Sequence, residues 1–219
     1  MTLPSGHPRL SKRPFSLEEL LADGIVHAVA LIAGLIAFAV LIAKVATTGD
    51  FGRTASVAIY AAGFFLMFGF SLAYNVTPPS TLKWLLRRFD HASIYIMIAG
   101  TYTALLATGA AGEWGALLLG LVWIGAAGGV AIKFIFPGRL DRLSILFFLV
   151  LGGAGVVALG PLSQGLPGAS FVLVLAGGAT YVIGIGFYLW KSLQFQNAIW
   201  HCFVASASAL HFAAVASAA

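Results

Sequence analysis

Charged residues are scarce in this sequence. Of its 219 residues, 9% are Asp, Glu, Lys or Arg and 60% are hydrophobic, whereas soluble domains carry roughly 25% charged residues. This much apolar surface excludes an ordinary water-soluble domain. The composition predicts a polytopic membrane protein of the all-α class.

Cysteine and acidic residues are also few. A single cysteine, Cys202, excludes an internal disulfide framework. Twelve basic against seven acidic residues give a net charge of +5, but the basic residues gather between apolar runs, which indicates membrane topology. We therefore expect no nucleic-acid partner. The first apolar run is uncharged over 24–43, and about 20 residues exceed a signal-peptide core, so we expect an uncleaved first helix.

Apolar runs bracketed by charges predict seven membrane spans. The charge-free stretch from Leu143 to Trp190 is too long for one crossing, and its Pro- and Gly-rich segment 160–168 predicts a turn. The sequence thus divides into a cytoplasmic N-terminal segment, 1–22, and a seven-helix transmembrane domain, 23–219. The predicted spans are 24–45, 55–76, 90–108, 114–136, 143–160, 168–190 and 197–218.

The basic residues predict the orientation of these spans. Ten of the twelve fall on the side of the N-terminus, and the other two, Lys44 and Arg53, fall on the opposite side. Because Lys and Arg are retained on the cytoplasmic side, we expect the N-terminus inside the cell, the C-terminus outside, and the cytoplasmic (inner) membrane as the location. This orientation is opposite to that of the usual seven-helix receptors.

Polar side chains are predicted to meet in one layer near the cytoplasmic ends of four spans. Ser71 and Asn75 share a helix face at the end of the second span, and Asn197 and His201 do so at the start of the seventh. Asp90 opens the third span at the same level, and His27 lies one turn into the first. His211 lies ten residues beyond His201, about 15 Å further along the helix.

Histidines and a carboxylate in such a layer are the components of a zinc site that activates water. Each also has a structural interpretation. Asp90 could cap the third span at its N-terminus, and the histidines and asparagines could form hydrogen bonds between helices. The i,i+4 spacing is a weak metal signal here, because each pair contains an amide in place of a second histidine.

These residues resemble a known family. The stretch RRFDHASIYIMIAGTYTALL (87–106), with SLAYN (71–75) and NAIWHCFV (197–204), is similar to the bacterial haemolysin III family, part of the progestin and adipoQ receptor (PAQR) superfamily. The resemblance covers about Glu18 to Phe212. It implies a seven-helix membrane protein with its N-terminus inside.

The resemblance also implies zinc ligands, which this sequence only partly retains. The family motifs are Ser-x3-His on the second helix, Asp on the third and His-x3-His on the seventh. Ser71, Asp90 and His201 match them, but Asn75 and Asn197 stand at the other two histidine positions. The family also has an N-terminal motif, Glu-x2-Asn-x2-Thr-His. This sequence retains its histidine as His27, has Asp23 and Val26 at the Asn and Thr positions, and has Glu19 displaced by one residue.

A neutral amide is a weak zinc ligand. We therefore expect a degraded zinc site, most simply a hydrogen-bonded layer in which both asparagines donate to Asp90. The alternatives are a rearranged metal site using Asp90, His201 and His27 or His91, and a harder cation held by oxygen ligands.

Three functions remain open at this point. The first is binding of a membrane lipid or small amphiphile in a cytoplasmic-side cavity, in membrane homeostasis or signalling, with Ser71, Asn75, Asp90, Asn197, His201 and His27 as binding residues. The second is a zinc-dependent lipid amide hydrolase of the ceramidase type, in which Asp90 acts as base or orienter and Ser71 positions the substrate. The third is a pore-forming cytolysin. The sequence does not indicate an oligomeric state.

Overall fold

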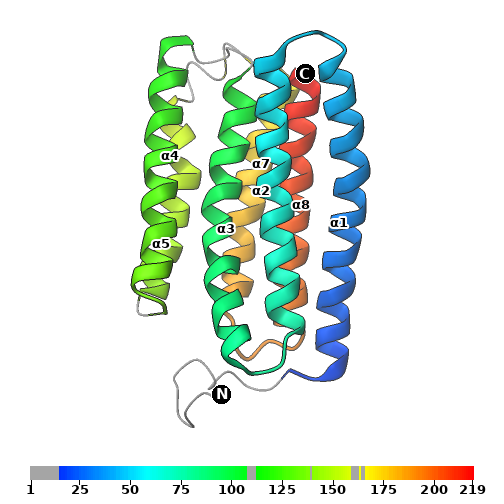
Figure 1. The fold of residues 1–219 in the computed structure, drawn as a ribbon, viewed down its shortest axis with the longest axis vertical. Helices are drawn as coiled ribbons and strands as arrows, with labels where there is room; N and C mark the ends of the chain where they lie inside the picture. The colour runs from blue at the N-terminus through cyan, green and yellow to red at the C-terminus, as the bar shows by residue number, and fades with distance from the viewer. Residues whose placement is uncertain (1–14, 108–111, 139, 159–162, 164–165) are drawn as a thin grey trace.

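The computed structural model describes residues 15–107, 112–138, 140–158, 163 and 166–219, and these form a bundle of helices (Figure 1). No strand occurs within these ranges. The all-α expectation is confirmed for these ranges, which contain seven α-helices and one 3₁₀ segment. They are α1 (Leu17–Ala46), α2 (Phe51–Val76), α3 (Thr81–Leu106), α4 (Gly112–Ile135), α5 (Asp141–Gly152), η1 (Gly153–Ala158), α7 (Gly168–Leu189) and α8 (Gln196–Ala218).

Successive α-helices run in opposite directions, so the start of α1 and the C-terminus lie at opposite ends of the bundle (Figure 1). The closest packing joins α2 to α3 and α7 to α8, and α1 packs against both α2 and α8. One end of the bundle carries the α2–α3 and α7–α8 connections and most of the described basic residues. We call it the basic end; its cations are Lys83, Arg87, Arg88, Lys133 and Lys191.

The helices α1, α2 and α3 begin at least one turn before their predicted spans, because capping residues rather than charges set their starts. Ser16 and Glu19 form a capping box at α1, and the side chains of Asp50 and Ser80 cap α2 and α3. Basic residues that the prediction placed between spans are therefore helical; these are Arg53, Lys83, Arg87 and Arg88. One interpretation of Asp90 is wrong: it lies well inside α3 and does not cap it.

The fifth predicted span, 143–160, is not one continuous α-helix. The α-helix ends at Gly152 and a 3₁₀ segment follows to Ala158. Adjacent glycines weaken α-helix because they carry the largest backbone entropy cost. The turn predicted over 160–168 lies largely outside the described residues.

Five of the described helices, α1, α2, α4, α7 and α8, are long and apolar enough to cross a membrane. The apolar segment of the α5–η1 region, Leu143–Val156, is shorter. The helix α3 is long enough but less apolar, since it includes Asp90, His91 and several hydroxyl side chains. Large apolar side chains on α1, including Ile25, Val29 and Ile32, are more than half exposed. The protein is therefore an integral membrane protein.

Candidate functional site

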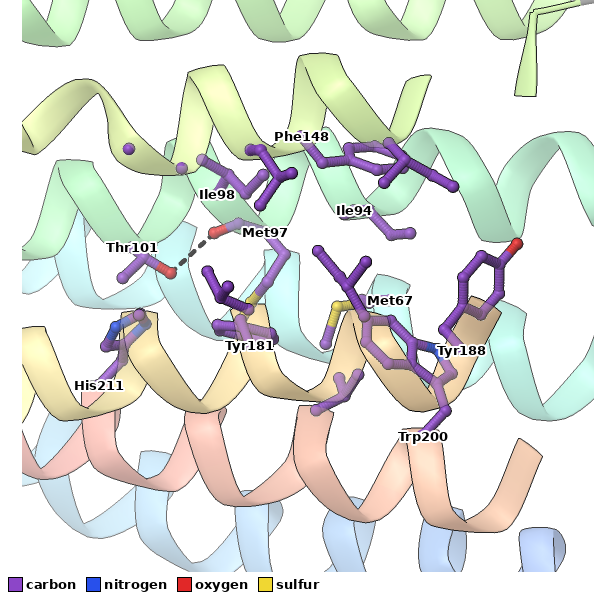
Figure 2. A pocket seen from close by; sticks show the side chains of 18 of the residues that line it. Met67, Ile94, Met97, Ile98, Thr101, Phe148, Tyr181, Tyr188, Trp200 and His211 are labelled. Carbon is purple, nitrogen blue, oxygen red and sulfur yellow. Dashed lines mark hydrogen bonds between the residues drawn. The ribbon is translucent and has the colours of Figure 1, made fainter. Parts of the chain in front are cut away.

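A cavity of about 450 Å³ lies inside the bundle. Residues of α2, α3, α5, α7 and α8 form most of its wall, and most of these side chains are apolar. In Figure 2, Ile98 and Phe148 approach the cavity from one side, and Tyr181 and Trp200 approach it from the other. The cavity is thus a mainly hydrophobic chamber bounded by helices far apart in sequence.

The end of this cavity near the basic end of the bundle is polar. All six residues predicted from the sequence to bind a ligand are part of its wall, together with His91 and Lys133. The six come from four helices: His27, Ser71, Asn75, Asp90, Asn197 and His201. His211 lines the same cavity further along α8, where its Nε2 lies 3.2 Å from the carbonyl oxygen of Val174.

A stripe of buried polar residues on α1 brings that helix to the site. Glu19, Asp23 and His27 follow each other at intervals of four residues, which places them on one face. Glu19 Oε1 accepts a hydrogen bond of 2.9 Å from the backbone N–H of Phe195, which precedes α8 and has a left-handed backbone (φ 57°). This bond joins the start of α1 to the start of α8, the two helices that carry Asp23 and His201.

Asp23, His201 and Ser71 are joined in that order by hydrogen bonds across three helices. Asp23 Oδ1 lies 2.5 Å from His201 Nδ1, and His201 Nε2 lies 3.3 Å from Ser71 Oγ. All three residues are at most 9% exposed. Since a carboxylate oxygen accepts, His201 Nδ1 carries the proton and Nε2 is the acceptor that faces the Ser71 hydroxyl.

His27 contacts both His201 and Asp23. Its ring lies edge-on to that of His201, with centroids 4.4 Å apart, and its Nδ1 donates to the carbonyl oxygen of Asp23 at 2.7 Å. Its Nε2 is buried and has no hydrogen-bond partner among the described residues. That nitrogen is an acceptor which a hydroxyl group or water in the cavity would satisfy.

The two asparagines continue the polar layer on the other side of Ser71. Asn75 Nδ2 lies 3.0 Å from the Ser71 carbonyl oxygen and 3.4 Å from Ser71 Oγ, and Asn197 Nδ2 donates to Asn75 Oδ1 at 3.3 Å. The described bonds of the amides thus lead to Ser71 and to each other. Asp90 also lines the cavity, with one carboxylate oxygen 3.8 Å from His91 Nε2.

Sequence reasoning gave Asp23 no role in the site. The carboxylate that contacts His27 and His201 is Asp23, whereas the prediction chose Asp90. The signal was present in the four-residue spacing of Glu19, Asp23 and His27. Spacing alone, however, cannot tell which helix faces this stripe.

Zinc, which the resemblance implies, requires imidazole, thiolate or carboxylate ligands. Asn75 and Asn197 do not fit this requirement, because both are neutral amides engaged in hydrogen bonds. In the described part of the chain, one other group has ligand atoms within 4.8 Å of one another: Asp23, His27 and His201. In this group His201 uses both ring nitrogens in hydrogen bonds with protein groups. The family-type site of three imidazoles is therefore absent from the described residues.

Comparison with known proteins identifies the family. A family described as "Haemolysin-III related" matches residues 15–212. The chain belongs to the haemolysin-III-related family. It is 36% identical to Hemolysin-3 of Bacillus cereus over 197 residues, covering 90% of each chain. It is equally identical to the Hemolysin-3 homolog of Bacillus subtilis over 199 residues, covering 90% of this chain and 93% of the relative.

A more distant relative extends the relationship beyond bacteria. The human monocyte to macrophage differentiation factor is 28% identical over 169 residues, covering 72% of this chain and 67% of that protein. The resemblance to the haemolysin III family and to its wider superfamily is thereby confirmed. Against the ligand pattern that the resemblance implies, this chain carries amides, Asn75 and Asn197, at two histidine positions.

Proposed function

We propose that this haemolysin-III-related protein binds a long-chain amphiphile, such as a membrane lipid or fatty acid, within its central cavity and serves in membrane homeostasis or signalling. The observation that carries the proposal is how polar and apolar side chains divide along the wall of this cavity: the wall is apolar over most of its length and polar at one end. An amphiphile has the same division. Its chain would lie along the apolar wall and its head group at the polar layer.

The residues at each end suit these two parts of the ligand. The apolar portion includes Met97, Ile98, Leu105, Phe148 and Val174. The polar end adds charged and hydrogen-bonding side chains at the level where a head group would lie; these are Asp90, His91, Lys133, Asn75 and Asn197. Burial of the acyl chain would contribute about 0.8 kcal/mol per methylene group.

Lipid would enter the cavity sideways, between α5–η1 and α7. These two segments are not among the closely packed helix pairs. Leu149 and Val156 on one side, and Leu175 and Val182 on the other, line the cavity and are also 37–63% exposed. Apolar side chains that belong both to the cavity wall and to the outer surface favour an opening toward the hydrocarbon of the membrane.

The proposal includes seven membrane crossings in the cytoplasmic membrane, with the N-terminus in the cytoplasm. The alternating direction of the seven α-helices supports an odd number of crossings. The basic end of the bundle would then face the cytoplasm, because Lys and Arg are retained on that side. The polar layer would lie just beneath the cytoplasmic head groups, where it is accessible to water.

Two substitutions in α7 test lipid binding. Gly178 lines the cavity and Gly186 does not, and an added Cβ would meet open space at both. We expect Gly178→Trp to fill the cavity and to weaken binding of a fluorescent long-chain fatty acid about tenfold or more. We expect Gly186→Trp to bind the fatty acid as the unmodified protein does. Titration of purified protein in detergent micelles measures both affinities.

Folding is checked by thermal unfolding of both variants. Equal fatty-acid affinity of the two folded variants, or a purified protein that neither binds the fatty acid nor carries lipid detectable by mass spectrometry, would contradict the proposal.

A further inference from the structure

Three side chains from three helices meet at the polar end of the cavity in the order carboxylate, imidazole, hydroxyl. We infer that Ser71 is the nucleophile of a metal-independent hydrolysis of long-chain acyl esters, with His201 as its base and Asp23 as the positioning residue. The inference rests on the proposed function, because the cavity supplies the substrate. It differs from zinc-activated hydrolysis, in which a metal-bound water attacks and the serine stays unmodified.

The hydrogen-bond geometry assigns the roles of these residues. Asp23 accepts from His201 Nδ1 at 2.5 Å, which fixes the tautomer with its lone pair on Nε2. That lone pair faces Ser71 Oγ at 3.3 Å. A serine is a weak nucleophile unless a base accepts its proton, and the base must be held in turn by a third group. The described site has all three elements.

Asn75 is placed to stabilise the oxyanion that forms on the substrate. The Asn197 side chain donates to Asn75 Oδ1 and so turns Asn75 Nδ2 toward Ser71. One N–H of that nitrogen bonds to the Ser71 carbonyl oxygen, and Nδ2 lies 3.4 Å from Ser71 Oγ. A fixed side-chain amide next to the nucleophile is a common oxyanion donor. The two amides that fail as zinc ligands thereby acquire a role.

The proposed reaction has two steps. Ser71 Oγ attacks the ester carbonyl carbon and gives its proton to His201 Nε2; the carbon–oxygen bond to the alcohol then breaks, and His201 protonates the departing alkoxide. Water next attacks the acyl-serine and gives a proton to His201. The bond from Ser71 Oγ to the acyl carbon breaks, Oγ regains the proton from His201, and a free fatty acid leaves.

The position of Ser71 indicates the substrate class. Its neighbours in the cavity wall include the apolar Met67 and Phe68 on one side and the polar Asn75 on the other. An acyl ester has its carbonyl at the same junction, between a hydrocarbon chain and a polar head. A long-chain carboxylic ester would therefore place its carbonyl carbon beside Ser71 Oγ.

Covalent labelling tests the nucleophile. Purified protein in detergent with a chelator should react with a fluorophosphonate, and mass spectrometry should find the adduct on Ser71. Hydrolysis of p-nitrophenyl laurate should fall by about 10²–10⁴-fold in Ser71→Ala. Ser170→Ala is the matched control and should keep both activities, because Ser170 is another fully buried serine that pairs with Ser217 and does not line the cavity.

The positioning role of Asp23 has its own readout. Asp23→Asn should lower the hydrolysis rate by about 10²–10⁴-fold while fatty-acid affinity is unchanged, because the wrong tautomer of His201 would then be favoured. Asp23→Glu keeps a carboxylate and should restore part of the hydrolysis rate. If Asp23 were only a structural contact, Asp23→Asn and Asp23→Glu would hydrolyse the ester at the same rate.

Failure of this inference is distinguishable from failure of the proposed function. A folded protein that binds the fatty acid but shows no adduct on Ser71 would overturn the inference and leave the lipid-binding proposal standing. Hydrolysis that survives in Ser71→Ala and disappears with the chelator would also overturn it, in favour of metal-activated water. Loss of fatty-acid binding by the unmodified protein would contradict both.

Discussion

Asn75 and Asn197 lie side by side, with the side chain of Asn197 donating to that of Asn75 at 3.3 Å. Histidines at these two positions would bring imidazoles within reach of each other and of the layer that contains His201. Two substitutions separate the present hydrogen-bonded layer from the three-imidazole pattern that the family resemblance implies.

Asn75→His combined with Asn197→His should create a zinc site. We expect about one zinc per chain in the purified double variant, because three imidazoles satisfy the tetrahedral preference of zinc with one position left for water. Elemental analysis after dialysis measures the metal. Asn75→His alone is the control and should hold much less; equal zinc in the single and double variants would show that the two asparagines do not mark a lost ligand set.

Two glycines govern how closely α2 and α3 approach. A Cβ on Gly63 would lie 3.1 Å from the backbone of Ile96 and Met97, and one on Gly100 would lie 3.1–3.2 Å from the backbone of Tyr60 and Ile59. Backbone atoms cannot move aside as a side chain can. Small residues at such crossings allow membrane helices to pack closely, and this pair of helices carries Ser71 and Asp90 into the cavity wall.

Gly100→Leu should therefore push α2 and α3 apart. We expect a loss of stability of about 1–3 kcal/mol, seen as a lower thermal unfolding midpoint in detergent, together with weaker fatty-acid binding. Gly69→Leu is the matched control on α2, because an added Cβ there meets open space. A similar unfolding midpoint for both variants would argue against the close approach.

The helices could be predicted from the sequence more fully than the site. Charge-bracketed apolar runs located the seven α-helices of the described residues, but the start of α3 at Thr81 depends on the Ser80 cap, and the 3₁₀ turn after Gly152 depends on local backbone preference. The polar residues expected in one layer do line one cavity. The Asp23–His201 bond could not be predicted, because it depends on which faces of α1 and α8 meet.

The whole bundle has a marked charge asymmetry, with the described cations Lys83, Arg87, Arg88, Lys133 and Lys191 at one end and Lys44 and Arg53 at the other. Translocation of Lys and Arg across the membrane is disfavoured, so the basic end should stay in the cytoplasm.

Reporter fusions test this orientation. Green fluorescent protein at the N-terminus should fluoresce, and alkaline phosphatase at the C-terminus should be active, since the first folds in the cytoplasm and the second requires export. Reversing the two reporters should abolish both signals. Active phosphatase at both ends would mean an even number of crossings and would refute the seven-span arrangement.

The hydrogen bond between Asp23 and His201 joins the first of the described helices, α1, to the last, α8, which is synthesised later. Until α8 has been inserted, the carboxylate of Asp23 lacks the imidazole that it faces in the finished bundle, and a carboxylate left unpaired among apolar helices is costly. Insertion of α8 therefore removes a penalty that every form lacking α8 must carry. Quality control in the membrane could use that difference to distinguish a product that lacks α8 from one that contains it.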